Sequence, residues 1–299
     1  MYLIQLVELL LVLSYDSSIY YYHFIIQMKI FKHRLALKRE ISSNKNLSFV
    51  PTMGGLHSGH KYLIKKAKAK RGKVIISIFV NPKQFNSKKD FKSYPRNLRL
   101  DLSILKKLKV DYVYIPNFKD VYSFRTTKKI YLDKFSKKLC GKFRRSHFLG
   151  VVNVVNRLLE IIKPRFIYFG KKDYQQLFII KKHIKKRNIK TKLISCKTIR
   201  SNNGVALSSR NKNLNNNSIL IASKVFKLLK TEKRNLKKGS FIKLNKSSII
   251  KKLNKLGVKK IDYIECINLN TLKKPLNTNS KFNIFIAYYL NGTRLIDNV

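Results

Sequence analysis

The sequence contains no tryptophan and few glycines (11), prolines (6) or acidic residues (14) among its 299 residues. Lysine and arginine together number 66, so the formal net charge is +52. The lysines are spread through nearly every segment, which is typical of a compositional bias acting on all exposed positions rather than of one binding face. Hydrophobic residues still make up 44% of the chain, which excludes a disordered protein. We therefore expect a folded core in one large domain or two moderate ones.

RNA-binding signatures are also missing. The sequence has no RNP1, KH or zinc-knuckle pattern to accompany its charge. We expect no specific nucleic-acid partner, only weak and salt-sensitive binding of polyanions. An RNA-binding protein that uses the +52 charge is the alternative from a different functional class.

Cysteine is scarce and irregularly placed. Cys140, Cys196 and Cys266 are far apart, form no CxxC pair and make no zinc pattern. An odd number cannot pair completely within the chain, so a reducing compartment, the cytoplasm, is expected.

The first 27 residues lack the features of a targeting segment. The apolar run at residues 3–13 is interrupted by Gln5 and Glu8, and no basic residue precedes it. It is shorter than the roughly 20 residues that a membrane span needs. We expect residues 1–27 to be a non-core extension, with Met28 as an alternative start and no membrane association. A membrane anchor is the competing interpretation.

Strand and helix patterns alternate from Met28 onward. Strands are expected at residues 47–52, 74–80, 112–115, 166–169 and 191–196, with helices at 60–71, 98–108, 147–162 and 175–186. This alternation indicates an α/β fold with a doubly wound, Rossmann-like parallel sheet over residues 28–196. Helical patterns at 218–229 and 241–256 then precede strand patterns at 261–267 and 284–290. We expect residues 197–299 to form a smaller α+β C-terminal lid domain.

The most informative segment is VPTMGGLHSGH, residues 50–60. A strand enters a glycine turn and a helix follows, and helix N-termini in doubly wound sheets bind phosphates. His57 and His60, three residues apart, fall on one side of the first turn and can reach one phosphate chain. Neither a Walker A loop nor a GxGxxG motif occurs here.

Three further segments carry polar side chains at strand ends or at the domain boundary. FVNPKQF (79–85) supplies the neutral amides of Asn81 and Gln84, which suit a small polar substrate. GKKDYQQ (170–176) supplies Lys172, which can neutralise phosphate charge, and Asp173, which can orient that lysine, cap the helix or contact a ribose hydroxyl. ALSSRN (206–211) supplies two hydroxyls and Arg210, a set that can grip a polyphosphate under a lid.

Together these segments resemble the pantoate–β-alanine ligase family. The stretches VPTMGGLHSGH, SIFVNPKQF, YPRN, SHFLGVV, FGKKDYQQL, ALSSRN and RLIDN lie in the family's order over about residues 28–298. The wider class is that of the HxGH nucleotidyltransferases.

The resemblance implies a two-step reaction with Mg²⁺ and ATP. The carboxylate of (R)-pantoate attacks the α-phosphate, giving pantoyl-adenylate and pyrophosphate. The amine of β-alanine then attacks the acyl carbon, releasing AMP and pantothenate. A homodimer is also expected, and no side chain of the enzyme need form a covalent intermediate.

The resemblance also implies roles for individual residues. His60, at the position usually named the catalytic acid, would act with His57 and Lys172. Gln84 and Gln176 would bind pantoate, and Gln84 would also meet β-alanine. ATP would contact Met53, Gly54, Gly55, Leu56, His57, Ser58, Gly59, His60, Gly170, Lys171, Lys172, Asp173, Ile199, Leu207, Ser208, Ser209 and Arg210. The Mg²⁺ ligands are not assigned, although Asp101 is a candidate.

The sequence departs from the family pattern at three places. Lys171 stands where the family usually has Glu, and Leu149 stands where it usually has Arg. Near Arg144 the familiar Arg-Pro-Gly-His-Phe is Arg-Arg-Ser-His-Phe. None of these changes removes a residue assigned to the reaction. A nucleotidyltransferase for a phosphorylated cofactor precursor is the rival within the class, but it would need a basic pocket where Gln84 and Gln176 are neutral.

Overall fold

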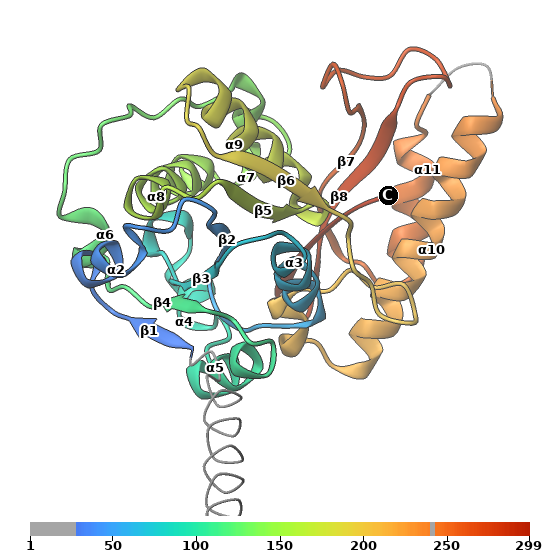
Figure 1. The fold of residues 1–299 in the computed structure, drawn as a ribbon. Helices are drawn as coiled ribbons and strands as arrows, with labels where there is room; N and C mark the ends of the chain where they lie inside the picture. The colour runs from blue at the N-terminus through green and yellow to red at the C-terminus, as the bar shows by residue number, and fades with distance from the viewer. Residues whose placement is uncertain (1–27, 240–242) are drawn as a thin grey trace, which may run out of the picture.

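The computed structural model describes residues 28–239 and 243–299, so the expected extension at 1–27 lies outside the described residues (Figure 1). The first unit is a six-stranded sheet in the order β1-β4-β3-β2-β5-β6, and every neighbouring pair is parallel. Its strands are β1 (Lys29–Phe31), β2 (Ser48–Thr52), β3 (Val74–Ile78), β4 (Tyr112–Tyr114), β5 (Phe166–Gly170) and β6 (Lys192–Cys196).

Helices connect these strands and cover both faces of the sheet (Figure 1). The longer ones are α2 (Arg34–Ile41), α3 (Ser58–Lys68), α5 (Leu98–Lys107), α8 (His147–Ile162) and α9 (Tyr174–Lys186). Short helices are α4 (Lys88–Lys92), α6 (Phe118–Tyr122) and α7 (Cys140–Phe143), and 3₁₀ turns are η1 (Pro82–Gln84), η2 (Lys134–Lys137), η3 (Lys171–Asp173) and η4 (Ser209–Asn213).

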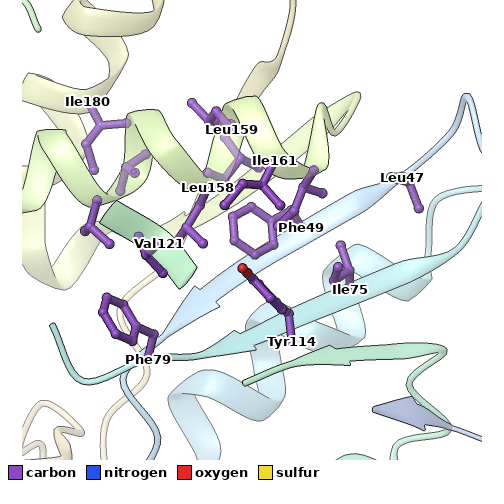
Figure 2. Close-up of a cluster of buried hydrophobic side chains, with 14 of the residues drawn as sticks. Leu47, Phe49, Ile75, Phe79, Tyr114, Val121, Leu158, Leu159, Ile161 and Ile180 are labelled. Atoms are coloured by element: carbon purple, nitrogen blue, oxygen red, sulfur yellow. The ribbon is translucent and has the colours of Figure 1, made fainter. Parts of the chain in front are cut away.

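Alternate residues of each strand serve opposite faces of the sheet. Figure 2 shows one face, where Phe49, Ile75 and Tyr114 meet apolar side chains of α8. Val50 and Ile76 point the other way, into a cluster with α3 and α5. The continuous apolar runs of the strands follow from this double burial.

The order of the strands places a crevice beside β2. The chain runs from β2 to β3 and β4 on one side, and β5 and β6 lie on the other. The carboxyl ends of β2 and β5 therefore meet at the topological switch point, where doubly wound sheets bind ligands.

The second unit packs beside this sheet (Figure 1). It consists of α10 (Asn216–Lys238), α11 (Lys246–Lys255) and an antiparallel sheet of β7 (Lys260–Asn268), β8 (Phe282–Leu290) and β9 (Thr293–Asn298). One face of this sheet packs on α10 and α11. The other face brings Ile267 and Phe285 against Phe135 and Leu139 of the first unit.

The expected doubly wound sheet and the smaller α+β unit are confirmed. Several details differ from the sequence expectations: β9 was not expected, and the helix expected at residues 60–71 is α3 at Ser58–Lys68. β1 and α2 were not expected, α10 extends past residue 229, and α11 begins at Lys246 rather than at residue 241. α10 continues because Leu236 still packs against the C-terminal core, and α11 begins where the Asn245 side chain caps it. The six-stranded sheet ends at Cys196, while a domain division at residue 197 stays a prediction.

No helix in the described ranges is both long and apolar enough to cross a membrane.

Candidate active site

A cavity of about 310 Å³ opens at the carboxyl ends of β2 and β5. Both units of the fold contribute to its walls. Many of the expected site residues line it: Met53, His57, Gly59, His60, Gln84, Gly170, Lys172, Asp173, Gln176, Ile199, Leu207, Ser208, Ser209 and Arg210. Gly54, Gly55, Leu56, Ser58 and Lys171 lie outside its lining.

The turn after β2 contains Gly54, Gly55 and Leu56, which lie outside the cavity lining. Gly54 and Gly55 have φ values of +76° and +62°, a left-handed conformation that favours glycine. Asp101, only 2% exposed, accepts the N–H groups of Gly55 (2.9 Å) and Leu56 (2.8 Å). Both carboxylate oxygens are thus engaged by the turn. This geometry gives Asp101 a structural role instead of the Mg²⁺ contact considered from the sequence.

His57 and His60 begin α3 and bond to its free backbone N–H groups. His57 Nδ1 accepts from Gly59 N at 3.0 Å, and His60 Nδ1 accepts from His57 N at 3.3 Å. The two rings lie 4.1 Å apart, centroid to centroid. A neutral imidazole that accepts at Nδ1 carries its proton at Nε2. Each ring is therefore left with one Nε2–H donor.

The surroundings keep both imidazoles neutral. Burial, followed by the positive charge of Lys172, lowers the pKa of His57 to about 4. Burial and the neighbouring His57 lower the pKa of His60 to about 3. At neutral pH these residues can donate hydrogen bonds to phosphate oxygens without acting as imidazolium ions.

Two cations complete the polar side of the cavity. Lys172 Nζ lies 2.9 Å from Asp173 Oδ1. Burial alone would raise the pKa of Asp173, but the charge and hydrogen bond of Lys172 lower it overall. Arg210 is held by Asp90, whose oxygens lie 3.1 Å from Nε and 3.0 Å from Nη2. Asp90 comes from α4, so the SSRN segment is tied to the first unit.

The neutral amides separate into structural and cavity-facing groups. Asn81 is buried and bonded to the Gly150 carbonyl (3.2 Å) and the Tyr122 hydroxyl (3.1 Å), so it anchors η1 instead of meeting a substrate. Gln175 also lines the cavity, but its amide donates to the carbonyls of Phe135 (2.8 Å) and Lys138 (2.7 Å) and accepts from Cys140 N (3.1 Å), so it is occupied by the fold. Gln84 and Gln176 remain on the cavity wall.

Other cavity residues were not assigned from the sequence. Arg144 and His147 lie beside Gln84, while Tyr263, Arg294 and Asn298 reach the cavity from β7 and β9. The resemblance in SHFLGVV and RLIDN marked these segments but gave them no chemistry. The C-terminal strands showed only an apolar alternation, from which no contact with the first unit could be read.

Of the three departures from the family pattern, Lys171 and Leu149 lie outside the cavity lining, and Arg145 and Ser146 of the third lie beside the lining residues Arg144 and His147. The Lys171 side chain is exposed, and only its carbonyl is used, as an acceptor for Asn298 Nδ2 at 3.1 Å. Leu149 is 49% exposed on α8.

No group of three or more metal-binding side chains occurs within residues 28–239 and 243–299. The carboxylates Asp90, Asp173 and Asp297 line the cavity, and each already lies beside a basic residue. A preformed protein cage for a cation is therefore missing from the part of the chain that the structure describes.

Comparisons with known proteins give the family of the chain. The model of the pantoate-beta-alanine ligase family matches residues 25–299. The chain is 41% identical over 258 residues to a pantothenate synthetase of Ruthia magnifica subsp. Calyptogena magnifica, covering 86% of this chain and 92% of that one. It is also similar to the crystal structure of the Francisella tularensis pantoate-beta-alanine ligase complexed with beta-gamma ATP and beta-alanine, with a TM-score of 0.77 and 39% identity over 91% of this chain and 97% of that one. The pantothenate synthetase of Thermus thermophilus gives a TM-score of 0.80 at 28% identity, over 91% of this chain and 99% of that one. The chain therefore belongs to the pantoate–β-alanine ligase family and is a ligase.

Proposed function

We propose that this cavity activates pantoate with ATP as an acyl-adenylate and then transfers the pantoyl group to the amine of β-alanine. One observation carries the proposal. Two Nε2–H imidazoles, Lys172 and Arg210 line the same cavity as the neutral amides of Gln84 and Gln176. The donors and cations suit a triphosphate, and the amides suit a small polar acid.

In the first step a carboxylate oxygen of pantoate forms a bond to the α-phosphorus of ATP. The bond from that phosphorus to the bridging oxygen breaks, and pyrophosphate leaves with the electron pair. Negative charge grows on the phosphate oxygens during this exchange, so preorganised donors accelerate it. His57, His60 and Lys172 are the groups that we assign to this stabilisation. No proton transfer is needed.

In the second step the amine lone pair of β-alanine forms a bond to the acyl carbon. The bond from that carbon to the adenylate oxygen breaks, AMP leaves with the electron pair, and the new amide nitrogen loses a proton to solvent. The chain's contribution is to hold the acyl group beside the amine. Gln84 and Gln176 are the residues that we assign to the pantoyl group.

We propose that Mg²⁺ would bind together with the ATP phosphates. The ion commonly binds substrate phosphates together with one or two carboxylates and keeps several waters. Asp90 and Asp173 on the cavity wall suit this role, whereas both oxygens of the third carboxylate there, Asp297, are bonded to Arg200. Its chemistry would be to neutralise charge on the leaving pyrophosphate.

We also propose that the protein is a homodimer, that it is cytoplasmic, and that residues 197–299 act as a lid over the cavity. Three free, buried cysteines support a reducing compartment. The placement of Arg210 and β9 in the cavity wall supports this lid role, because the second unit closes part of the cavity. Sedimentation velocity tests the dimer, and a monomer at micromolar concentration would contradict it.

Exchange of labelled pyrophosphate into ATP tests the function. We expect exchange that requires pantoate and proceeds without β-alanine. A structurally unrelated carboxylate is the control and should support none. Exchange that is independent of pantoate, or activation of the unrelated acid alone, would overturn the proposed function.

A further inference from the structure

Arg144 brings a guanidinium to the cavity just before α8. Its Nη2 donates to the Gln84 carbonyl at 3.1 Å, and its Nη1 lies 3.2 Å from His147 Nε2. His147 Nδ1 lies 2.7 Å from the same Gln84 carbonyl. Because a carbonyl only accepts, Nδ1 carries the proton and Nε2 accepts from Arg144. The guanidinium plane is thus fixed by two contacts.

Of the two side chains in this contact, only Arg144 is charged at neutral pH. Burial, followed by the charge of Arg144, lowers the pKa of His147 to about 3. Burial and the nearby Arg210 and Arg294 lower the pKa of Arg144 only to about 10. At neutral pH the pair carries one positive charge, which resides on Arg144.

Three guanidiniums lie near one another at the cavity, and two of them have carboxylate partners. Asp90 binds Arg210 at 3.0 Å, and Asp262 binds Arg294 at 2.7 Å. Among the residues that the structure describes, no carboxylate oxygen lies within 4.0 Å of an Arg144 nitrogen. A half-buried cation without a counter-ion is partly desolvated at a cost, so a ligand that supplies the counter-ion gains from it.

We propose that Arg144 binds the carboxylate of β-alanine and so selects the amine substrate of the proposed ligase reaction, on which this inference rests. The guanidinium has five N–H donors and uses two of them here, which leaves enough for a bidentate carboxylate contact.

The chemistry of the two steps singles out this carboxylate. The carboxylate of pantoate loses its charge when the adenylate forms. The carboxylate of β-alanine stays ionised throughout amide formation. Arg144 is bonded to the main chain of Gln84, which places the cation beside an amide assigned to the pantoyl group.

The test compares Arg144→Met with Arg145→Met, because Arg145 is the exposed neighbour. We expect Arg144→Met to raise the KM for β-alanine about a hundredfold or more, the effect of removing one partner of a buried charge pair. Pantoate-dependent pyrophosphate exchange should stay within about twofold, since β-alanine is absent from that step. Arg145→Met should change neither quantity.

Propylamine, which lacks the carboxylate, gives a second measurement. The wild-type protein should prefer β-alanine to propylamine in kcat/KM, and Arg144→Met should lose most of this preference. Arg144→Lys keeps the positive charge but loses the bidentate guanidinium, so its preference for β-alanine should lie between those of the wild-type protein and Arg144→Met. It replaces Arg144→Met in the test if that variant does not fold.

An unchanged preference in both variants would overturn the role of Arg144. A fall in pyrophosphate exchange that parallels the loss of amide formation would also overturn it and place the guanidinium on the phosphates instead. Absence of exchange in the wild-type protein would refute the proposed function itself.

Discussion

His57 and His60 each use one ring nitrogen for the fold and keep the other for the cavity. Nδ1 caps the first turn of α3, and Nε2–H is left as a donor. The helix N-terminus and the rings therefore present hydrogen-bond donors to the same region. A neutral N–H donor stabilises charge without transferring its proton, which suits a step in which only the charge on the phosphate changes.

Replacement of His60 tests the first step. We expect His60→Ala to slow formation of pantoyl-adenylate by roughly a hundredfold or more, the range for a lost transition-state donor. Rapid-quench measurement of the adenylate in a single turnover gives the rate. The exposed His33 provides the control variant His33→Ala, which should keep the normal rate. A normal adenylate rate in His60→Ala, with failure only in amide formation, would refute this assignment.

The lowered histidine pKa values predict how stability depends on pH. The ordinary pKa of 6.5 falls to about 4 for His57 and to about 3 for His60 and His147. Below 6.5 the unfolded chain therefore binds more protons than the folded one. The free energy of unfolding should be fully present above that pH and should decrease as the pH falls towards 4. Urea titrations at about pH 7.5 and 5.5 measure it, and equal stability at both would contradict the prediction.

Gln175 and Gln176 are adjacent, and we expect them to have different roles. Gln176→Ala should raise the KM for pantoate by the factor that corresponds to a loss of about 1–3 kcal/mol of binding free energy, while leaving the affinity for ATP and the melting temperature nearly unchanged. Gln175→Ala removes bonds to two carbonyls and should lower stability by about 1–3 kcal/mol. Steady-state kinetics and thermal melts on both variants decide the matter. The reverse assignment of the two effects would be incompatible with this geometry.

At the scale of elements, β9 holds the turn that carries Lys172. The Asn298 amide donates to the carbonyls of Lys171 (3.1 Å) and Lys172 (2.9 Å), and it accepts from Asn283 at 2.8 Å. A strand of the second unit thereby fixes η3 in the first. The position of the Lys172 ammonium depends on this contact.

Variants of Asn298 test the contact. Asn298→Ala should reduce the adenylation rate by roughly tenfold because a small displacement of a positioned cation is costly. Asn298→Asp should be worse, since a carboxylate would face two carbonyl oxygens. Asn283→Ala, which removes only the support, should have a smaller effect. Single-turnover rates measured beside melting temperatures separate positioning from unfolding, and a loss that follows the melting temperature alone would argue against positioning.

The elements of the first unit could largely be predicted because their apolar periodicity matches their burial. The helix expected at residues 147–162 is α8, since its apolar face packs on the sheet and Pro164 follows its end. β1 and α2 could not be predicted, because three-residue β1 is exposed and α2 buries only Leu37 and Ile41. A pattern needs several buried positions before it can be read.

The candidate site could be predicted where a motif carries both chemistry and a turn, as at His57 and His60. The roles of Asp101, Asn81 and Gln175 could not, because each depends on which backbone groups the tertiary fold brings near. Arg144 and His147 required the position of Gln84, which lies 60 and 63 residues away. The type of a side chain alone predicts neither its hydrogen-bond partner nor the direction in which it points.

At the scale of the whole molecule, the cavity depends on both units, while the charge of +52 is spread over the surface. Binding to RNA should therefore be weak, without sequence preference, and should fade steeply with salt. Filter binding at several salt concentrations measures it. A nanomolar site that prefers one RNA sequence and survives physiological salt would contradict this view.

The apolar run at residues 3–13 lacks the flanking residues of a signal peptide or a membrane anchor. A protein that begins at Met28 should therefore fold and keep the pyrophosphate exchange rate of the full chain. Exchange and light scattering on both forms provide the comparison. An inactive or aggregated shorter form would show that residues 1–27 contribute to the fold or the site.

The central claim is that one cavity forms a pantoyl-adenylate, and oxygen-18 in the carboxylate of pantoate tests it most directly. The carboxylate attacks the α-phosphorus, and β-alanine then displaces AMP from the acyl carbon. One carboxylate oxygen of pantoate therefore stays on the phosphate of AMP. Mass spectrometry of the products should find one labelled oxygen in each AMP and none in pyrophosphate. Unlabelled AMP, or label in pyrophosphate or inorganic phosphate, would contradict the account.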